Sequence, residues 1–258
     1  MDMIELIWKE HLEGVRRKQY IAIGILLIGF ALLSPVMMKA LPLLLEAQMG
    51  NQELAAAIPV NLRESMRSFI KNIYQIGTLL LVYLGASQVA YERNQRLVFS
   101  IHAGINIQSL IRAKVLVYGF VIFLVTTLAT VASAVYGALL IPGSWEFSQA
   151  IGLIGLEVSG YLFFAYLVGM LVATWIRNKM LAMALGSLFL FVLAWMSGFT
   201  TFQWMLPTYL LAEANLLIGY WTKPLLGCFL ITAAWSGLIM EAAGWKLNRT
   251  NMTQGEGS

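Results

Sequence analysis

The sequence predicts an all-α, polytopic membrane protein with six transmembrane helices. Of its 258 residues, 59% are hydrophobic and only 12% are charged, whereas soluble domains carry about 25% charged residues. Apolar blocks recur along the chain, and about 20 residues of helix suffice to cross about 30 Å of hydrocarbon. We place the spans at about 19–38, 70–91, 115–139, 149–175, 180–199 and 224–241, within a single transmembrane domain over 1–258.

The basic residues predict which side of the membrane each connection faces. Lys and Arg collect in the cytoplasmic segments of membrane proteins. With a cytoplasmic N-terminus, the inner segments carry 12 of the 17 basic residues. The segment 39–71 carries most of the others, and its amphipathic pattern indicates a partly helical outer segment. We therefore expect both termini in the cytoplasm, and we attribute the net charge of +4 to this bias rather than to nucleic-acid binding.

Residues 1–18 predict an amphipathic helix that lies on the membrane surface and leads into the first span. The apolar face comprises Met3, Ile4, Ile7, Trp8, Leu12 and Val15. The charged face comprises Glu5, Lys9, Glu13 and Arg16. Such an elbow helix either anchors the chain to the membrane surface or docks a cytoplasmic partner, and Trp8 and Arg16 are its candidate contact residues.

The longest inner connection, 92–114, is too long for a simple turn and too polar to cross the membrane. We expect a short helix pair on the inner surface, with Ile105 on its apolar face; a solvated connector is the alternative. The side chains that this pair would present to a partner are those of Glu92, Arg93, Arg96 and His102.

The segment 200–222 predicts re-entrant or surface helices on the outer side. Pro207 breaks the helix, and Glu213 and Asn215 then stand between two apolar stretches. A polar pair in this setting fits a gate, and it fits an ordinary outer connection equally well.

Glu157 is the acidic residue that lies well inside a predicted span. A carboxylate at that depth costs a few kcal/mol on insertion scales. It is therefore either a protonated or snorkelling carboxyl near the outer interface or a residue that lines a substrate route.

The sequence lacks the motifs of several catalytic sites. It contains no G-x-x-x-x-G-K-[ST] and no H-E-x-x-H, and His11 and His102 both lie outside the predicted spans. Cys228 stands alone in an apolar run. We therefore expect no catalytic, cofactor-binding or metal-binding residues on this chain.

The order of these segments resembles that of the ABC-2 type permeases, the transmembrane subunits of ATP-binding-cassette transporters. The resemblance rests on four stretches: WKEHLEGVRRKQY before the first span, the long outer segment after it, YERNQRLVFSIHAGI up to the R-A-K before the third span, and LPTYL before the sixth. Glu92 and Lys114 match residues that such permeases carry around the second connection. His102-Ala103-Gly104 departs from the pattern, because a proline is frequent there.

The resemblance implies a subunit of an exporter in the cell membrane, without enzymatic activity of its own. Two permease subunits, identical or homologous, would work with two copies of an ABC ATPase that binds ATP and Mg. The candidate ATPase-coupling residues are Glu92, Arg93, Arg96, His102, Ile105, Trp8 and Arg16. The candidate translocation or gate residues are Glu157, Pro207, Glu213 and Asn215.

Two alternatives stay open. The first is a stand-alone channel or secondary transporter, although a single acidic residue without a basic partner within the spans argues against ion coupling. The second is a membrane sensor or assembly protein without cargo.

Overall fold

The computed structural model describes residues 2–49, 60–93, 106–141, 150–197, 203–217 and 220–255. These residues are almost entirely helical, and they include no strand. Six of the helices in these ranges are long and apolar enough to span a membrane. The predicted all-α class and the six candidate spans are therefore confirmed.

The chain begins with the short helix α1 (Met3–Arg16). The six candidate spans are α2 (Gln19–Met49), the continuous run of α4 (Leu62–Asn72), η1 (Ile73–Gly77) and α5 (Thr78–Tyr91), α7 (Ile107–Leu140), α8 (Ile151–Trp175), α9 (Lys179–Ser197) and α11 (Lys223–Gly255). Two short elements, η3 (Gln203–Met205) and α10 (Tyr209–Leu216), stand between α9 and α11.

Several helices extend beyond the predicted spans. α7 begins at Ile107 rather than near 115, so residues 107–114 of the predicted inner connection are the first two turns of one long helix. The Asn106 side chain caps this helix by accepting a hydrogen bond from the Gln108 amide at 2.9 Å. The predicted span begins only after the charged side chains. The helix includes them, because the Asn106 cap sets where it begins.

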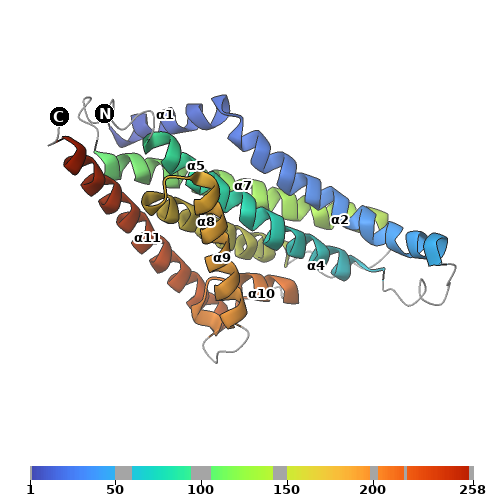
Figure 1. The fold of residues 1–258 in the computed structure, drawn as a ribbon. Coiled ribbons are helices and arrows are strands. Elements are labelled where there is room, and N and C mark those ends of the chain that lie inside the picture. The colour runs from blue at the N-terminus through green and yellow to red at the C-terminus, as the bar shows by residue number, and fades with distance from the viewer. Residues whose placement is uncertain are drawn as a thin grey trace.

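α8 is the most buried of the six candidate spans. In its most apolar window 83% of the residues are buried, against 22% for α9 and 28% for both α2 and α11. The peripheral helices expose large apolar side chains, such as Leu230 and Leu238 on α11. This arrangement suits a bundle whose surroundings are lipid rather than water. α1 and the C-terminal end of α11 lie at the same end of the bundle, and α10 lies toward the other end (Figure 1).

Helices α5 and α8 cross with their backbones almost touching. A Cβ added at Gly85 would overlap the carbonyl oxygen of Tyr166, and a Cβ added at Gly169 would overlap the carbonyl oxygen of Val82. Small residues permit such close approach between membrane helices. This pair of glycines therefore fixes how α5 lies on the central helix.

We predict that Gly169→Ala destabilises the protein, because the new methyl group must push α5 away from α8. Overpacking of this kind costs about 1–3 kcal/mol. Thermal unfolding of the purified protein in detergent measures the effect. Gly237→Ala is the matched control, because a Cβ at Gly237 meets nothing within 4 Å. Equal midpoints for the two variants would contradict the proposed role of the crossing.

Candidate functional site

One buried ammonium group joins three helices at the end of the bundle that carries both termini. Lys114, on α7, is only 1% exposed. Its Nζ lies 2.9 Å from Oε1 of Glu92, which directly follows α5, and it also donates a hydrogen bond to Oε2 of Glu10 on α1. We call Lys114, Glu10, Glu13 and Glu92 the Lys114 cluster. It connects α1 to segments that are about 80 and 100 residues further along the sequence.

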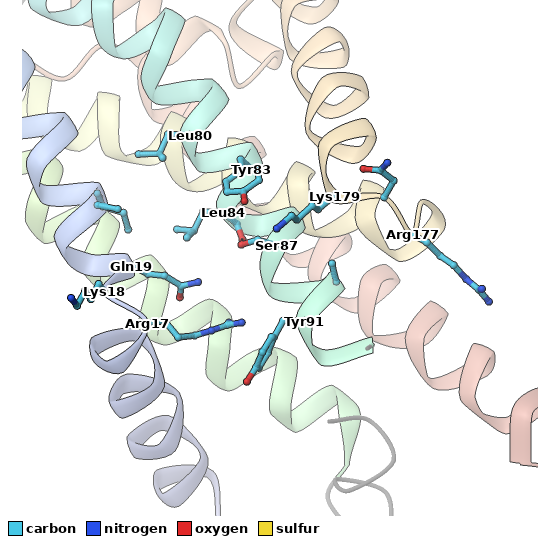
Figure 2. A pocket seen from close by; sticks show the side chains of 14 residues that line it. Arg17, Lys18, Gln19, Leu80, Tyr83, Leu84, Ser87, Tyr91, Arg177 and Lys179 are labelled. Atoms are coloured by element: carbon cyan, nitrogen blue, oxygen red, sulfur yellow. The ribbon is translucent and has the colours of Figure 1, made fainter. Parts of the chain in front are cut away.

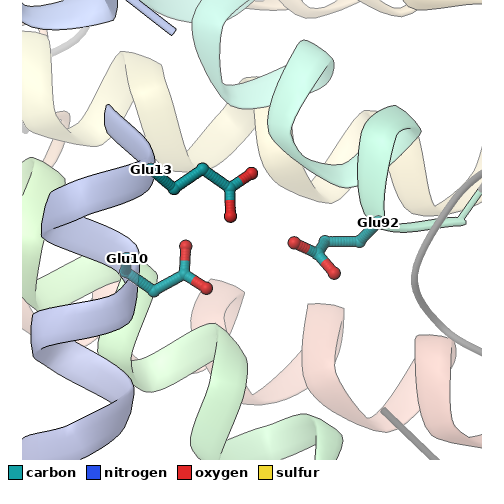
Figure 3. Close-up of side chains that lie close together, drawn as sticks. All are labelled: Glu10, Glu13 and Glu92. Atoms are coloured by element: carbon teal, nitrogen blue, oxygen red, sulfur yellow. The ribbon is translucent and has the colours of Figure 1, made fainter. Parts of the chain in front are cut away.

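The three carboxylates of the cluster point toward one another (Figure 3). Each of Glu10, Glu13 and Glu92 brings an oxygen within 4.8 Å of the others, a spacing that could hold a metal ion. The protein's own cations occupy this role here, since Lys114 pairs with two of the carboxylates and Arg17 Nη1 lies 3.4 Å from Glu13 Oε1. We therefore interpret the cluster as an ionic lock between helices.

Burial raises the pKa of the Glu10 carboxyl, and the attraction of Lys114 opposes this increase. The opposition is expected for a buried pair, because removing charges from water costs free energy that their mutual attraction must recover. The buried Glu10 carboxylate therefore depends on the charge of Lys114.

Further hydrogen bonds connect α5 and α7, next to the Lys114 cluster, to the start of α2. Gln88 on α5 donates a hydrogen bond from Nε2 to Oε1 of Gln19, at 2.7 Å, and the Tyr118 hydroxyl of α7 donates to the same oxygen. Gln19 is the first residue of α2, and the preceding Lys18 has a left-handed backbone with φ of 56°. The joint between α1 and α2 is therefore tight and is held from two sides.

The expected coupling residues of the connection 92–114 lie in different surroundings. Glu92 is buried inside the Lys114 cluster rather than presented at an exposed surface. Arg93 donates a hydrogen bond from Nη2 to the Thr174 carbonyl at the end of α8, at 2.6 Å. Burial and, to a lesser extent, the charge of Arg177 lower the pKa of Arg93. The remaining candidates, Arg96, His102 and Ile105, lie outside the described residues.

On α1 the expected apolar face is exposed, and Trp8 is 62% exposed. Arg16, in the last turn, is exposed as well. The buried face instead carries Leu6, Glu10 and Glu13, and Leu6 packs with Leu110 and Ala113 of α7. Glu13, expected on the exposed charged face, is therefore buried, because Arg17 and the other members of the Lys114 cluster surround it.

The second group of predicted residues comes together around α10. Glu157 on α8 and Glu213 on α10 are both buried and lie close enough for their charges to repel each other. The Tyr209 hydroxyl donates a hydrogen bond to Glu213 Oε1. Burial raises the pKa of Tyr209, and the hydrogen bond to Glu213 adds to this effect.

Asn215 helps to hold α10 in place. Its backbone carbonyl accepts a hydrogen bond from Nε of Arg67 on α4 at 3.2 Å, and its side-chain amide donates to the Leu211 carbonyl at 3.0 Å. The backbone of Asn215 thus connects α10 to α4, whereas its side chain bonds within α10. Pro207 is buried just before α10 and ends no long helix, because the short turn η3 precedes it.

Pro207 also borders an apolar cavity of about 450 Å³. The walls come from α8, α9 and α11, and they include Phe164, Leu193 and Trp235. A cavity of this size and lining suits an apolar ligand.

No known protein-family model matches this chain, and no curated protein matches it either. Its functional interpretation therefore rests on the sequence and on the geometry described above. The sequence pattern indicated Glu92 and Lys114 but not their partner Glu10. The available signal for Glu10 was a pair of acidic residues three positions apart on a short helix, together with one Lys at the start of an apolar run.

We predict that Lys114→Met strongly destabilises the protein, because it leaves Glu10 and Glu92 buried without their shared cation. Breaking a buried ion pair in this way costs about 3–5 kcal/mol. Arg112→Met is the control, since Arg112 pairs with Glu241 at 2.6 Å at a site where both side chains are nearly half exposed. That pair is worth at most about 1 kcal/mol. Thermal unfolding midpoints that fall equally in both variants would argue against an ionic lock.

We also predict that Glu157→Gln keeps or raises the unfolding midpoint, because it replaces a buried carboxyl beside Glu213 with a neutral amide of similar size. Tyr209→Phe serves as the comparison. It should lower the stability by about 1 kcal/mol, since Glu213 then loses a hydrogen-bond donor. A larger loss in Glu157→Gln than in Tyr209→Phe would show that Glu157 makes a stabilising contact instead.

Proposed function

We propose that this chain is the transmembrane subunit of an ABC transporter, an exporter that moves its substrate with ATP hydrolysed by a separate ATPase subunit. The observation that carries the proposal is the Lys114 cluster. It connects α1, the end of α5 and the start of α7. These are the segments on which, by the resemblance to ABC-2 type permeases, an ATPase would act.

The proposed topology places both termini in the cytoplasm of a cell, with the chain in the cell membrane. Two features support it. The end of the bundle that carries both termini also carries the basic segments 16–18 and 177–179, as expected for a cytoplasmic face. α1 exposes an apolar face that includes Ile4 and Trp8, as expected for a helix that lies in the membrane interface.

The proposed mechanism is mechanical, and this chain contributes no covalent chemistry. A push on α1 or on the segment after Glu92 would reach both α5 and α7, because the buried ion pairs resist separation. α5 would pass the movement to α8 at the Gly85 and Gly169 crossing. Because α8 forms one wall of the apolar cavity, the ATPase face and the cavity would share one moving element, as allosteric coupling requires.

The apolar cavity supports an apolar or amphipathic cargo. In this proposal Pro207 borders the route, while Glu157, Glu213 and Asn215 form part of the outer gate around α10. The working unit would contain two permease subunits, identical or homologous, and two ATPase subunits that hold ATP and Mg.

Copurification tests the proposal. The tagged chain, isolated from native membranes, should bring down an ABC ATPase. Alanine substitution of Arg93, Arg96 and His102 together should lower its recovery about tenfold, equivalent to ~1.4 kcal/mol of binding free energy. The matched control is alanine substitution of Lys39, Lys71 and Lys223, three basic residues of the proposed outer side that are exposed in the structure. This control should leave the recovery unchanged.

Three outcomes would overturn the proposal. The first is that no ATPase is recovered and the Arg93/Arg96/His102 variant functions normally. The second is transport by the reconstituted chain alone, which would indicate a stand-alone channel or secondary transporter. The third is an associated ATPase without any transported cargo, which would indicate a membrane sensor or assembly protein.

A further inference from the structure

A cavity of about 590 Å³ lies where the start of α2 faces α5 and the connection between α8 and α9. Four of the basic residues that the structure describes line it: Arg17, Lys18, Arg177 and Lys179. Arg17 and Lys179 approach it from opposite sides (Figure 2). Two parts of the chain that are about 160 residues apart thus supply positive charge to one cavity.

None of the described residues that line this cavity carries a carboxylate. Arg17 lies 3.4 Å above the centre of the Tyr91 ring and pairs with Glu13, and Lys179 faces the Tyr83 ring at 5.7 Å. In the part of the chain that the structure describes, Lys18, Arg177 and Lys179 form no ion pair with an acidic residue. The cavity therefore has positive charge that the described residues leave largely uncompensated.

The depth of the cavity in the membrane follows from its lining. Gln19 begins one candidate span, Tyr91 ends another, and Asn178 lies between two more. The basic residues therefore stand at the level where spans end, which is the level of lipid headgroups. They also stand on the side that carries both termini. In the proposed topology this side faces the cytoplasmic leaflet, whose anionic lipids attract basic segments.

The part of the cavity that belongs to the spans is apolar. Ala22 on α2 and Leu80 on α5 form the accessible part of this wall, and the buried Ile23 and Leu84 lie behind them. Ala22 and Lys179 are both exposed, so the cavity can be reached from outside the bundle. A ligand that combines a phosphate with an acyl chain satisfies both parts of the lining, whereas a small soluble anion satisfies only the basic part.

We propose that this cavity binds one anionic phospholipid, with its phosphate held by Arg17, Lys18, Arg177 and Lys179 and an acyl chain lying along Ala22 and Leu80. Basic cavities between membrane helices are suited to anionic headgroups, and guanidinium groups bind phosphate through paired hydrogen bonds. The bound lipid would connect α2 and α9, two helices that are largely exposed within the bundle. The proposal does not depend on the proposed transport function.

The test uses the full-length chain, delipidated in a maltoside detergent, and native mass spectrometry to count bound lipids. Dioleoyl phosphatidylglycerol should bind at one saturable site, and dioleoyl phosphatidylcholine should not compete for it. Each basic residue near an anionic headgroup contributes about fivefold in affinity, so Lys18→Gln, Arg177→Gln and Lys179→Gln together should weaken binding about 100-fold. Arg17 is kept, because it also pairs with Glu13.

The control variant carries Lys39→Gln, Lys71→Gln and Lys223→Gln, which remove the same amount of charge from exposed residues that do not line the cavity. It should bind phosphatidylglycerol as the unmodified chain does. If the triple cavity variant does not fold, Lys179→Gln alone should still weaken binding about fivefold.

Equal binding of the two phospholipids, or equal loss in the cavity and control variants, would overturn the proposal. Inorganic phosphate and glycerophosphoglycerol distinguish a lipid from a soluble phosphate. If either one at millimolar concentration displaces the bound phosphatidylglycerol completely, the cavity is a soluble-anion site and the proposal is wrong.

Discussion

The close crossing of α5 and α8 is the constraint on which the rest of the bundle depends. Because the backbones nearly touch at Gly85 and Gly169, the orientation of α5 on the central helix is fixed. Residues three and seven positions after Gly85 lie on the same side of a helix. These residues are Gln88 and Glu92, and both are buried. The crossing therefore directs Gln88 and the following Glu92 into the bundle rather than toward lipid.

The Lys114 cluster follows from that geometry. Once Glu92 points inward, a cation must meet it, since an unpaired buried carboxylate is costly. Lys114 supplies the cation from α7, and Glu10 completes the set from α1. Replacing a buried ion pair by apolar side chains is often neutral or stabilising, so such a pair is weak evidence for stability. Here the ion pair determines how α1 is oriented, because only one placement of α1 brings Glu10 to the ammonium group of Lys114.

The sequence was sufficient for the class and for six candidate spans, because both depend on local composition and length. It was less accurate for helix ends. The predicted spans 19–38 and 115–139 stop next to Lys39 and start next to Lys114, yet α2 continues past the first residue and α7 begins before the second. A charged side chain does not end a helix, and one near the end of a span can reach the interface or find a partner.

The candidate sites were only partly accessible to sequence reasoning, because they depend on which helices become neighbours. Glu157 and Glu213 each stood out alone as an acidic residue in apolar surroundings. Their proximity follows from the packing of α10 on α8. Glu10 had no such signal, because on a short amphipathic helix it resembles any surface carboxylate. Its burial depends on the contact between α1 and α7.

The α1–α2 joint is where the two proposals meet. Arg17 pairs with Glu13 of the Lys114 cluster and also lines the basic cavity. Its neighbour Lys18 has the left-handed backbone of the joint and lines the same cavity. Any movement of α1 must rotate this joint, so it would change the position of both basic residues. A lipid phosphate bound there would favour the arrangement in which both side chains reach it. A force on α1 and a lipid in the cavity would therefore act on one structural element.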